Sequence, residues 1–216
     1  MAEIPKAYEP QAVETKWYSF WQKNECFTAD PDRVSDSRPG YSIVIPPPNV
    51  TGVLHMGHVL NNTIQDILAR KARMDGKEVL WLPGTDHAGI ATQSVVERKL
   101  IKDGTMRHRD ELGREKLLEH IWGWKDKHGG IIIEQLKKLG ASCDWSRLRF
   151  TMDENYTKCV QRIFVDLFQT GLIYRGKRMV NWCPKSLTAL SDEEVIMKEQ
   201  NSQLYYFKVQ VVEEAD

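Results

Sequence analysis

The chain has 216 residues, and its 30 basic and 30 acidic side chains cancel to a formal net charge of zero. Hydrophobic residues make up 41% of the chain and charged residues 28%, a composition typical of a globular α/β protein. A zero net charge excludes nucleic-acid binding through an overall positive field, so such a partner would have to be met through local patches. The first ten residues (MAEIPKAYEP) contain no apolar signal-peptide core, and no run is long enough to span a bilayer. We therefore expect no membrane partner.

The cysteines are scattered without the spacing of a disulfide framework, at Cys26, Cys143, Cys159 and Cys183. This usage is typical of a reducing compartment, and we expect a cytoplasmic protein.

An amino-terminal helix is predicted over residues 10–24, with Pro10 near its start, where a missing N–H group costs little. Its helical face carries Val13, Trp17, Phe20 and Trp21, which we expect to pack onto the domain that follows. Residues 28–40 are polar and rich in turn formers, as in a linker.

A strand, a turn and a helix follow in order. Residues 41–45 (YSIVI) predict a buried strand, and residues 46–58 (PPPNVTGVLHMGH) form the turn. A helix is expected to open at His58, with a one-sided apolar pattern, and to stop at Asp75-Gly76. That pattern consists of Leu60, Ile64, Ile67 and Leu68. The carboxyl end of a strand facing a helix amino terminus is where α/β sheets bind phosphate groups.

The turn contains residues suited to a nucleotide. Its prolines stiffen the exit from the strand, and Gly52 and Gly57 allow close approach of a ligand to the backbone. His55 and His58 are three residues apart, so both can face one side of the helix and hydrogen-bond a phosphate. The alternative is a loop with merely polar surface histidines. A zinc pair is disfavoured, because no further ligands follow at metal-site spacing.

A second strand is predicted at residues 79–82 (VLWL), buried on both faces, as part of a βαβ unit with a parallel sheet. The turn after it, residues 83–89 (PGTDHAG), should meet the first turn at the same sheet edge. There Asp86 could bind a ligand ammonium group. Alternatively, Asp86 or Thr85 could cap the helix expected to start near Ile90.

The rest of the first part is predicted to be helical. One helix should end at Asp103-Gly104, and residues 109–139 should form two helical runs broken at Gly129-Gly130. The histidines of this region, His108, His120 and His128, are expected to be solvated helix positions. A strongly amphipathic helix then carries Val160, Ile163, Phe164, Leu167 and Phe168 and ends at Gly171.

After Leu172 the pattern changes to short strands, which predicts a β-rich module. The residues that carry this pattern are Tyr174, Met179, Val180, Trp182, Val195, Ile196, Tyr205, Phe207, Val209 and Val211. We assign no phosphate contact to the two basic clusters at residues 70–77 and residues 175–178, since such runs are more often solvated faces.

Four stretches together resemble the valyl-tRNA synthetases, a family of class I aminoacyl-tRNA synthetases: PPPNVTGVLHMGH, LWLPGTDHAGIATQ, GASCDWSR and GLIYRGKRMVNWCP. The similarity runs from about Tyr8 to Phe207. Residues 55–58 (HMGH) match the class motif usually written HIGH. The PPPNVTG and GTDHAGIATQ forms are similar to the valyl pattern rather than to the isoleucyl or leucyl ones.

The resemblance implies that valine and ATP, bound with Mg²⁺, react to valyl-adenylate, and that the valyl group then passes to tRNA(Val). It implies that His55 and His58 are catalytic and contact the ATP phosphates, and that Gly57 leaves room for the adenine ring. It further implies that the Pro46 carbonyl and Asp86 bind the valine ammonium group, with Asn49 beside them. We expect a monomer.

The chain departs from the family pattern in lacking KMSKS, the anticodon-binding helices and nearly all of the editing domain. We therefore expect an amino-terminal fragment. Relatives with Cys-Pro-x-Cys could hold zinc, but residues 183–186 here read CPKS, so no protein-bound zinc is predicted.

The expected fold class is α/β, the first half of a Rossmann-like catalytic domain. The expected divisions are an amino-terminal helix and linker (1–40), the half-domain (41–171) and a β-rich segment leading into the inserted editing domain (172–216). Two alternatives are an inactive nucleotide-binding module and another branched-chain aminoacyl-tRNA synthetase.

Overall fold

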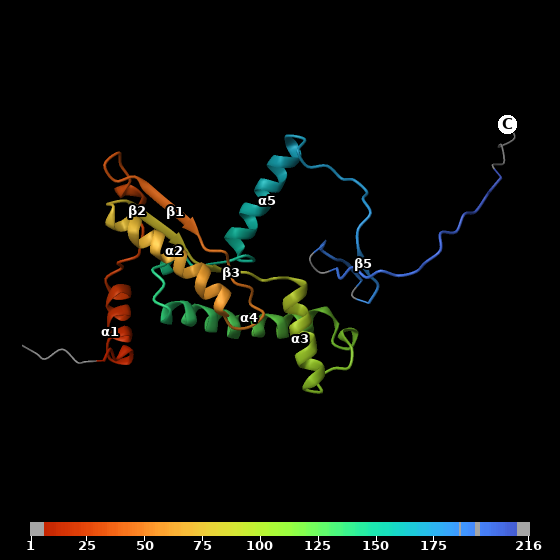
Figure 1. Cartoon of the computed structure of the whole chain (residues 1–216), viewed down its shortest axis with the longest axis horizontal. Helices are drawn as coiled ribbons and strands as arrows, with labels where there is room; N and C mark the ends of the chain where they lie inside the picture. Colours follow the sequence, from red (N-terminus) through yellow and green to blue (C-terminus); the bar gives the residue numbers. More distant parts are fainter. Residues whose placement is uncertain (1–6, 186, 193–194, 211–216) are drawn as a thin grey trace, which may run out of the picture. The chain divides into compact units, whose positions relative to one another are not determined.

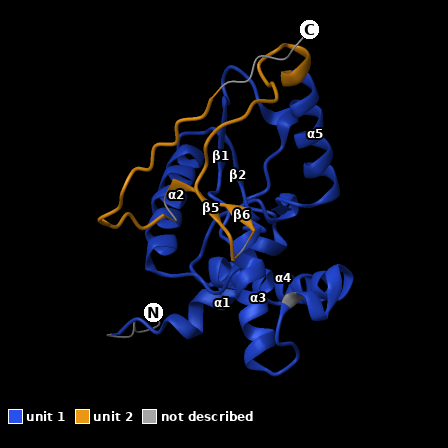
Figure 2. Cartoon of the chain, turned by 90° about the vertical axis from the view of Figure 1, so that its right-hand side faces the viewer, with its two compact units in different colours: residues 1–166 blue, residues 167–216 orange. Residues whose placement is uncertain are grey.

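The computed structural model describes residues 7–185, 187–192 and 195–210. The chain divides into two units, Met1–Asp166 and Leu167–Asp216 (Figures 1 and 2). Within the described residues, every helix is too short or too polar to cross a bilayer.

Two parallel strands and the helix between them form a βαβ element in the first unit (Figure 1). Strand β1 (Gly40–Val44) pairs with β2 (Glu78–Leu82), and helix α2 (Met56–Met74) connects them and packs against β2. This confirms the predicted βαβ order and the parallel pairing. β2 is largely buried, as expected, but β1 alternates between exposed and half-buried residues. The prediction of a buried first strand is therefore wrong, because among the described strands only β2 pairs with β1.

Helix α2 begins at Met56, two residues before the expected start at His58. His55 is its N-cap residue, with an extended backbone and a side chain that accepts a hydrogen bond from the Gly57 N–H group. Side-chain capping of this kind satisfies an amide of the first turn and so favours the earlier start. The predicted end is confirmed: Asp75 is the C-cap, and Gly76 has a φ of 80°.

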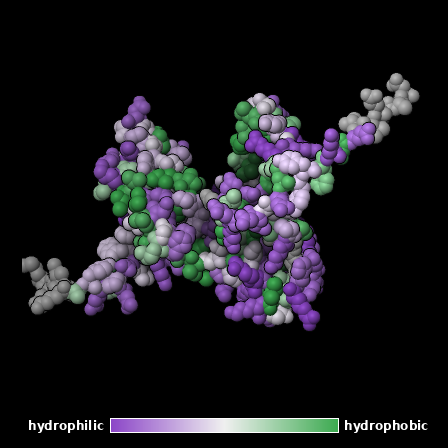
Figure 3. Space-filling model, turned by 45° about the vertical axis from the view of Figure 1, so that its right-hand side comes forward, coloured by the Kyte–Doolittle hydropathy of each residue, from purple (hydrophilic) through white to green (hydrophobic). Residues whose placement is uncertain are grey.

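The two faces of α2 differ from the sequence pattern. Its buried residues are Asn62, Ala69 and Ala72. The predicted apolar face is exposed instead, by 48% to 65% of each residue, at Leu60, Ile64, Ile67 and Leu68. Small alanine side chains let the helix lie close to the sheet, so the larger residues point away from it. Figure 3 shows apolar side chains gathered in patches on the surface.

The main core of the first unit surrounds Trp81 of β2, which is completely buried. Its indole N–H group donates a 3.0 Å hydrogen bond to Gln65 Oε1 on α2, so its polar atom is satisfied. The buried residues of this cluster come from β2, the turn after β1, α2, the long helix α4 (Gly113–Lys138) and residues 141–143. They are Ile45, Val50, Ala69, Ala72, Val79, Trp81, Ile132, Leu136, Ala141 and Cys143.

Helix α3 (Ile90–Lys102) ends at Asp103 and Gly104, as predicted. Helix α4 (Gly113–Lys138) follows a short 3₁₀ turn (Arg109–Glu111) and runs without interruption through residues 129 and 130. The predicted break at Gly129-Gly130 is therefore wrong. A glycine inside a helix costs only about 1 kcal/mol relative to alanine, and packing of α4 onto the core outweighs that cost.

The amino-terminal helix α1 (Pro10–Lys23) forms as predicted, but its packing residues differ. Trp17 and Phe20 are about half exposed. Tyr18 makes the specific contacts instead: its hydroxyl donates a 2.7 Å hydrogen bond to the Ala141 carbonyl and accepts one of 2.7 Å from the Trp145 indole. The expectation that all of its aromatics pack inward is wrong.

A second pair of short parallel strands joins the turn after β2 to a later segment of the chain. Strand β3 (Gly84–Thr85) pairs with β4 (Arg149–Phe150). Short 3₁₀ turns lie at Pro31–Arg33 and Trp145–Arg147. Helix α5 (Glu154–Gln169) follows β4.

The basic residues of α2 mostly serve the fold. Arg70 donates to Asp66 Oδ2 at 2.6 Å and to the Gly140 carbonyl at 2.8 Å. Arg73 donates to the hydroxyl and carbonyl of Ser142 at 2.7 and 2.9 Å. These guanidinium groups hold the segment at residues 140–142 against α2.

The second unit contains one short antiparallel pair, β5 (Trp182–Cys183) with β6 (Thr188–Ala189) (Figure 2). The other strands expected near Tyr174, residues 179–180, residues 195–196 and residues 205–209 do not form within the described residues. Val211 falls outside them. An alternating apolar pattern becomes a strand only when it finds a pairing partner and a surface to pack on.

Candidate nucleotide and amino-acid site

The two predicted turns meet, as expected, at the carboxyl ends of the strands. Asn49 forms a parallel bridge with Asp86. The Asp86 N–H group donates to the Pro48 carbonyl at 2.8 Å, and the Val50 N–H group donates to the Asp86 carbonyl at 2.9 Å. Two segments that follow different strands are thus joined by backbone hydrogen bonds.

The rings of the two histidines lie close together and tilted, with centroids 3.9 Å apart and a 40° angle between the ring planes. His55 Nδ1 accepts from the Gly57 N–H group at 3.1 Å, and His58 Nδ1 accepts from the His55 N–H group at 3.2 Å. Because each Nδ1 is an acceptor, each neutral ring carries its hydrogen on Nε2. Both rings therefore offer an N–H donor beside the amino terminus of α2, where anions are favoured.

The pKa of His58 is lowered from its ordinary value, first by desolvation and then by the neighbouring His55 ring. A lowered pKa favours the neutral imidazole near pH 7. In that form His58 acts as a hydrogen-bond donor through Nε2 and brings no fixed positive charge.

Gly57 has a specific steric role in this arrangement. A Cβ atom at this position would lie 2.9 Å from His55 Cε1 and 3.1 Å from its Nδ1. Glycine therefore allows the His55 ring to fold back over the first turn of α2, a role that the sequence pattern did not reveal.

Helix α4 holds the first turn at two points. Trp124 Nε1 donates to the Val50 carbonyl at 2.9 Å, and the Leu54 N–H group donates to Gln135 Oε1 at 2.9 Å. The sequence analysis missed both residues, because nothing in the local pattern of α4 indicates contacts with a turn so far away in the chain. His128 is also more than a solvated position, since its ring stacks on Trp124 with centroids 3.7 Å apart. His120 is exposed as predicted, and His108 is exposed but precedes the helix.

Asp86 does not cap helix α3. The N-cap residue is Gly89, and no side chain makes a capping hydrogen bond there, so the capping alternative for Asp86 or Thr85 is wrong. Instead Asp86 Oδ1 accepts from the Ala88 N–H group at 3.1 Å and from the Thr151 hydroxyl at 3.0 Å. About one third of the Asp86 side chain remains exposed, so a ligand can reach it.

The other predicted site residues are exposed at the same edge. Pro46 follows the end of β1, and Asn49 lies at the bridge to Asp86. The structure thus forms two groups: His55, Gly57 and His58 in the first turn of α2, and Asn49 with Asp86 at the strand ends.

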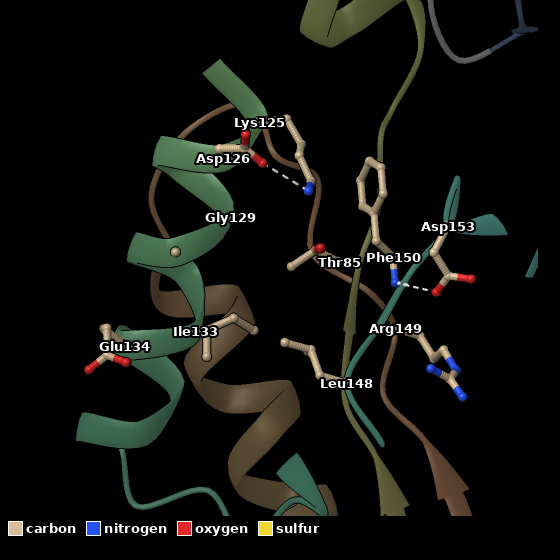
Figure 4. Close-up of a pocket in the computed structure, with 11 residues that line it drawn as sticks. Thr85, Lys125, Asp126, Gly129, Ile133, Glu134, Leu148, Arg149, Phe150 and Asp153 are labelled. Carbon is tan, nitrogen blue, oxygen red and sulfur yellow. Dashed lines mark hydrogen bonds and ion pairs between the residues drawn. The ribbon is translucent and has the colours of Figure 1, made fainter. Parts of the chain in front are cut away.

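The larger pocket of the first unit lies elsewhere, on the α4 side of β3 (Figure 4). It has a volume of about 530 Å³, and α4 faces β3 and β4 across it. Lys125 pairs with Asp126 at its rim, and its ammonium group lies 4.7 Å from the Phe150 ring centroid. None of the predicted site residues lines this pocket. A small pocket of about 40 Å³ lies between the strand ends and α5, lined by neighbours of the predicted site residues such as Ile45, Pro47 and Thr151.

Within the described part of the chain, no three His, Cys, Asp or Glu residues are placed to hold a metal ion. The groups at the amino terminus of α2 that could contact a nucleotide are the two imidazoles and the amides of the first turn.

The chain matches the family model for "tRNA synthetases class I (I, L, M and V)" over residues 16–212. The chain belongs to this family. Among curated relatives of this class I synthetase chain, the valine–tRNA ligase of Geobacter sulfurreducens is 59% identical over 212 residues, 98% of this chain. That of Phocaeicola vulgatus is 57% identical over 214 residues, 99% of this chain. The chain spans about a quarter of the length of these relatives, 23% and 24% respectively.

A solved structure resembles this class I synthetase chain with a TM-score of 0.68 and 25% sequence identity. It is the LeuRS of Agrobacterium radiobacter in a ternary complex with tRNA and LeuAMS, and the match covers 88% of this chain and 22% of that one. The likeness confirms the predicted fold class, the first part of a Rossmann-like α/β domain.

Proposed function

We propose that this chain is the amino-terminal part of a valine–tRNA ligase, which activates valine with ATP and transfers it to tRNA(Val). The observation that carries the proposal is the bridge between Asn49, in the segment that leads into His55, His58 and α2, and Asp86, at the end of β3. This arrangement places an anion-binding helix terminus and a carboxylate on neighbouring segments. The curated relatives named valine–tRNA ligase support the choice of amino acid.

On the nucleotide side, His55 and His58 would hydrogen-bond the ATP phosphates through Nε2. Their Nδ1 atoms are already used by backbone amides, so the donors are pre-oriented and need no reorganisation as charge develops. Gly57 contributes by letting the His55 ring fold over the helix terminus, and the adenine ring would lie next to it. Mg²⁺ would arrive bound to the phosphates of the nucleotide.

On the amino-acid side, Asp86 and the Pro46 carbonyl would bind the valine ammonium group, with Asn49 beside them. Asp86 is partly exposed and fixed by hydrogen bonds, as an ion-pair partner for a small ligand should be. The valine carboxylate would then attack the α-phosphate, forming the mixed anhydride and releasing pyrophosphate. No covalent bond to the enzyme is required, because positioning and electrostatics supply the rate enhancement.

The remaining features of the proposal concern the complete protein. The KMSKS lysines, the anticodon-binding helices and most of the editing domain would be supplied by sequence outside these 216 residues. The proposed divisions are 1–40, 41–171 and 172–216, with the last leading into the editing domain. We further propose a cytoplasmic, monomeric enzyme.

Pyrophosphate exchange tests this function in the full-length protein that carries the sequence. Labelled pyrophosphate should enter ATP when valine is present, and His58→Ala should slow this exchange by about 10² to 10³-fold, the loss typical of one transition-state donor. His120→Ala is the matched control, since His120 is exposed on α4, and should leave the rate unchanged.

The amino acid that drives the exchange decides between the alternatives. Exchange driven by isoleucine or leucine instead of valine would assign the chain to a related branched-chain synthetase. ATP binding without exchange under any amino acid would make it a non-catalytic nucleotide-binding module.

A further inference from the structure

The pairing of β3 with β4 brings a residue from far along the chain to Asp86. The register aligns Gly84 with Arg149 and Thr85 with Phe150, so the next position sets Asp86 beside Thr151. The Thr151 N–H group continues the ladder with a 3.2 Å hydrogen bond to the Thr85 carbonyl. Asp86 is therefore flanked by Asn49 on one side and Thr151 on the other.

The Thr151 hydroxyl makes three contacts, which use its full hydrogen-bonding capacity. It donates to Asp86 Oδ1 at 3.0 Å, accepts from the His87 N–H group at 3.0 Å and lies 2.6 Å from His87 Nδ1. A hydroxyl has one hydrogen and two acceptor lone pairs. With the hydroxyl hydrogen directed to Asp86, the remaining lone pair of Thr151 accepts from His87 Nδ1 in the ring tautomer that carries its hydrogen there.

These contacts leave one carboxylate oxygen of Asp86 for a ligand. Oδ1 accepts from Ala88 and Thr151 and lies 3.2 Å from His87 Nδ1. Among the residues that the structure describes, none donates a hydrogen bond to Oδ2. The contacts at Oδ1 fix the rotation of the carboxylate, so Oδ2 keeps a constant direction.

The backbone that carries Thr151 is itself held in place. Asp153 Oδ2 accepts from the Phe150 N–H group at 3.3 Å, and its Oδ1 accepts from the Tyr156 N–H group at 2.7 Å, at the start of α5. The hydrogen bond from the Tyr156 N–H group, helped by that from Phe150, outweighs burial and holds the pKa of Asp153 below its ordinary value, so the carboxylate is ionised near neutral pH. The backbone on both sides of Thr151 is thus held by hydrogen bonds, which fixes the position of its hydroxyl.

We infer that Thr151 is a positioning residue for amino-acid recognition: its hydroxyl orients Asp86 so that Oδ2 receives the ammonium group of the substrate. This inference rests on the proposed function and adds a residue to it. Thr151 does not touch the substrate and acts through Asp86.

The test compares Thr151→Val and Thr151→Ser in the full-length protein by valine-dependent pyrophosphate exchange. Valine has the shape of threonine without the hydroxyl, so the backbone is preserved and only the hydrogen bonds are lost. The KM for valine should rise about tenfold, as expected for losing a hydrogen bond to a charged group. The kcat and the KM for ATP should stay within about twofold, since ground-state and transition-state binding of the ammonium group weaken equally. Serine should restore the KM.

Two controls separate positioning from a general structural effect. Thr157→Val removes a hydroxyl from the exposed face of α5 and should change no constant. In an Asp86→Ala background, Thr151→Val should add less than about twofold, because a residue that acts through Asp86 has nothing left to orient.

The inference is overturned if the KM for valine stays unchanged in Thr151→Val or if Thr151→Ser fails to restore it. It is also overturned if the effects of Asp86→Ala and Thr151→Val on the KM for valine multiply in the double variant. A parallel rise in the KM for ATP would also overturn it, since it would indicate a general loss of structure. A wild-type protein without valine-dependent exchange would instead remove the proposed function itself, so the two failures are distinguishable.

Discussion

The two units of the chain differ in what holds them together. Among the described residues, every buried hydrophobic side chain lies between Ala29 and Cys143, in the first unit, around Trp81 and the long helix α4. None of the described residues of the second unit is buried, and its regular structure is the end of α5 and one short strand pair. A short helix or hairpin alone is only marginally stable, and a fixed tertiary arrangement requires burial of apolar surface.

A pair of tryptophan substitutions should give the largest contrast between the units. Trp81→Ala removes a fully buried side chain and should lower the free energy of unfolding by about 3–5 kcal/mol. Trp182→Ala, in the exposed strand β5, should change it by less than about 0.5 kcal/mol. Urea denaturation followed by circular dichroism measures both. Equal losses would mean that the second unit contributes to the same core.

The pH dependence of aspartate substitutions should also differ between the two units. Asp144 is fully buried in the first unit, and burial alone would raise its pKa, but hydrogen bonds from Ser146 and Ala29 and the charge of Arg147 outweigh this and lower it. Asp144→Asn should cost about 3 kcal/mol near pH 7, where the buried ion pair is broken.

The stability lost in Asp144→Asn should shrink as the pH falls. A lowered folded-state pKa contributes stability that is complete above the ordinary value of about 4 and is lost as the pH falls through the folded-state value. Unfolding measured from pH 7 down to pH 3 should therefore show the wild type approaching the variant. The exposed Asp192→Asn is the control and should show no such convergence. A gap that is constant with pH would contradict the role of the charge.

Glycines at the ends of two helices provide the smallest contrast. Gly76 ends α2 and Gly171 follows α5, with φ angles of 80° and 75°, and an added Cβ would meet no atom within 4 Å at either site. Alanine thus costs only the backbone strain, about 1 kcal/mol. Gly76→Ala should lower the global free energy of unfolding by this amount, whereas Gly171→Ala should leave it unchanged. A global loss for Gly171→Ala would show that the end of α5 is coupled to the core.

The sequence predicted those features that depend on local chemistry. The two parallel strands with a helix between them and the glycine stops at Gly76 and Gly104 were predicted correctly, and the βαβ order was enough to predict that two turns meet at one sheet edge. The exposed face of α2 was not, because periodicity identifies an apolar face without saying whether a neighbour covers it.

Side-chain contacts between distant segments also could not be predicted from the sequence. Thr151 and Gln135 reach the site across about 65 and 81 residues of chain, respectively. No local pattern distinguishes a threonine after a two-residue strand, or one glutamine of a long helix, from their neighbours. Only the register of β3 with β4 and the path of α4 bring them into place.

The hydrogen bond between the Leu54 amide and Gln135 has a consequence for dynamics. Amides in the sheet exchange their hydrogen with solvent when strands separate, whereas this one is protected by a side chain of α4. Its exchange rate is therefore set by how often Gln135 swings away. Hydrogen exchange at the turn that leads into the histidines therefore depends on the side-chain rotamer of Gln135 in α4 and is independent of the opening of the β1–β2 pair.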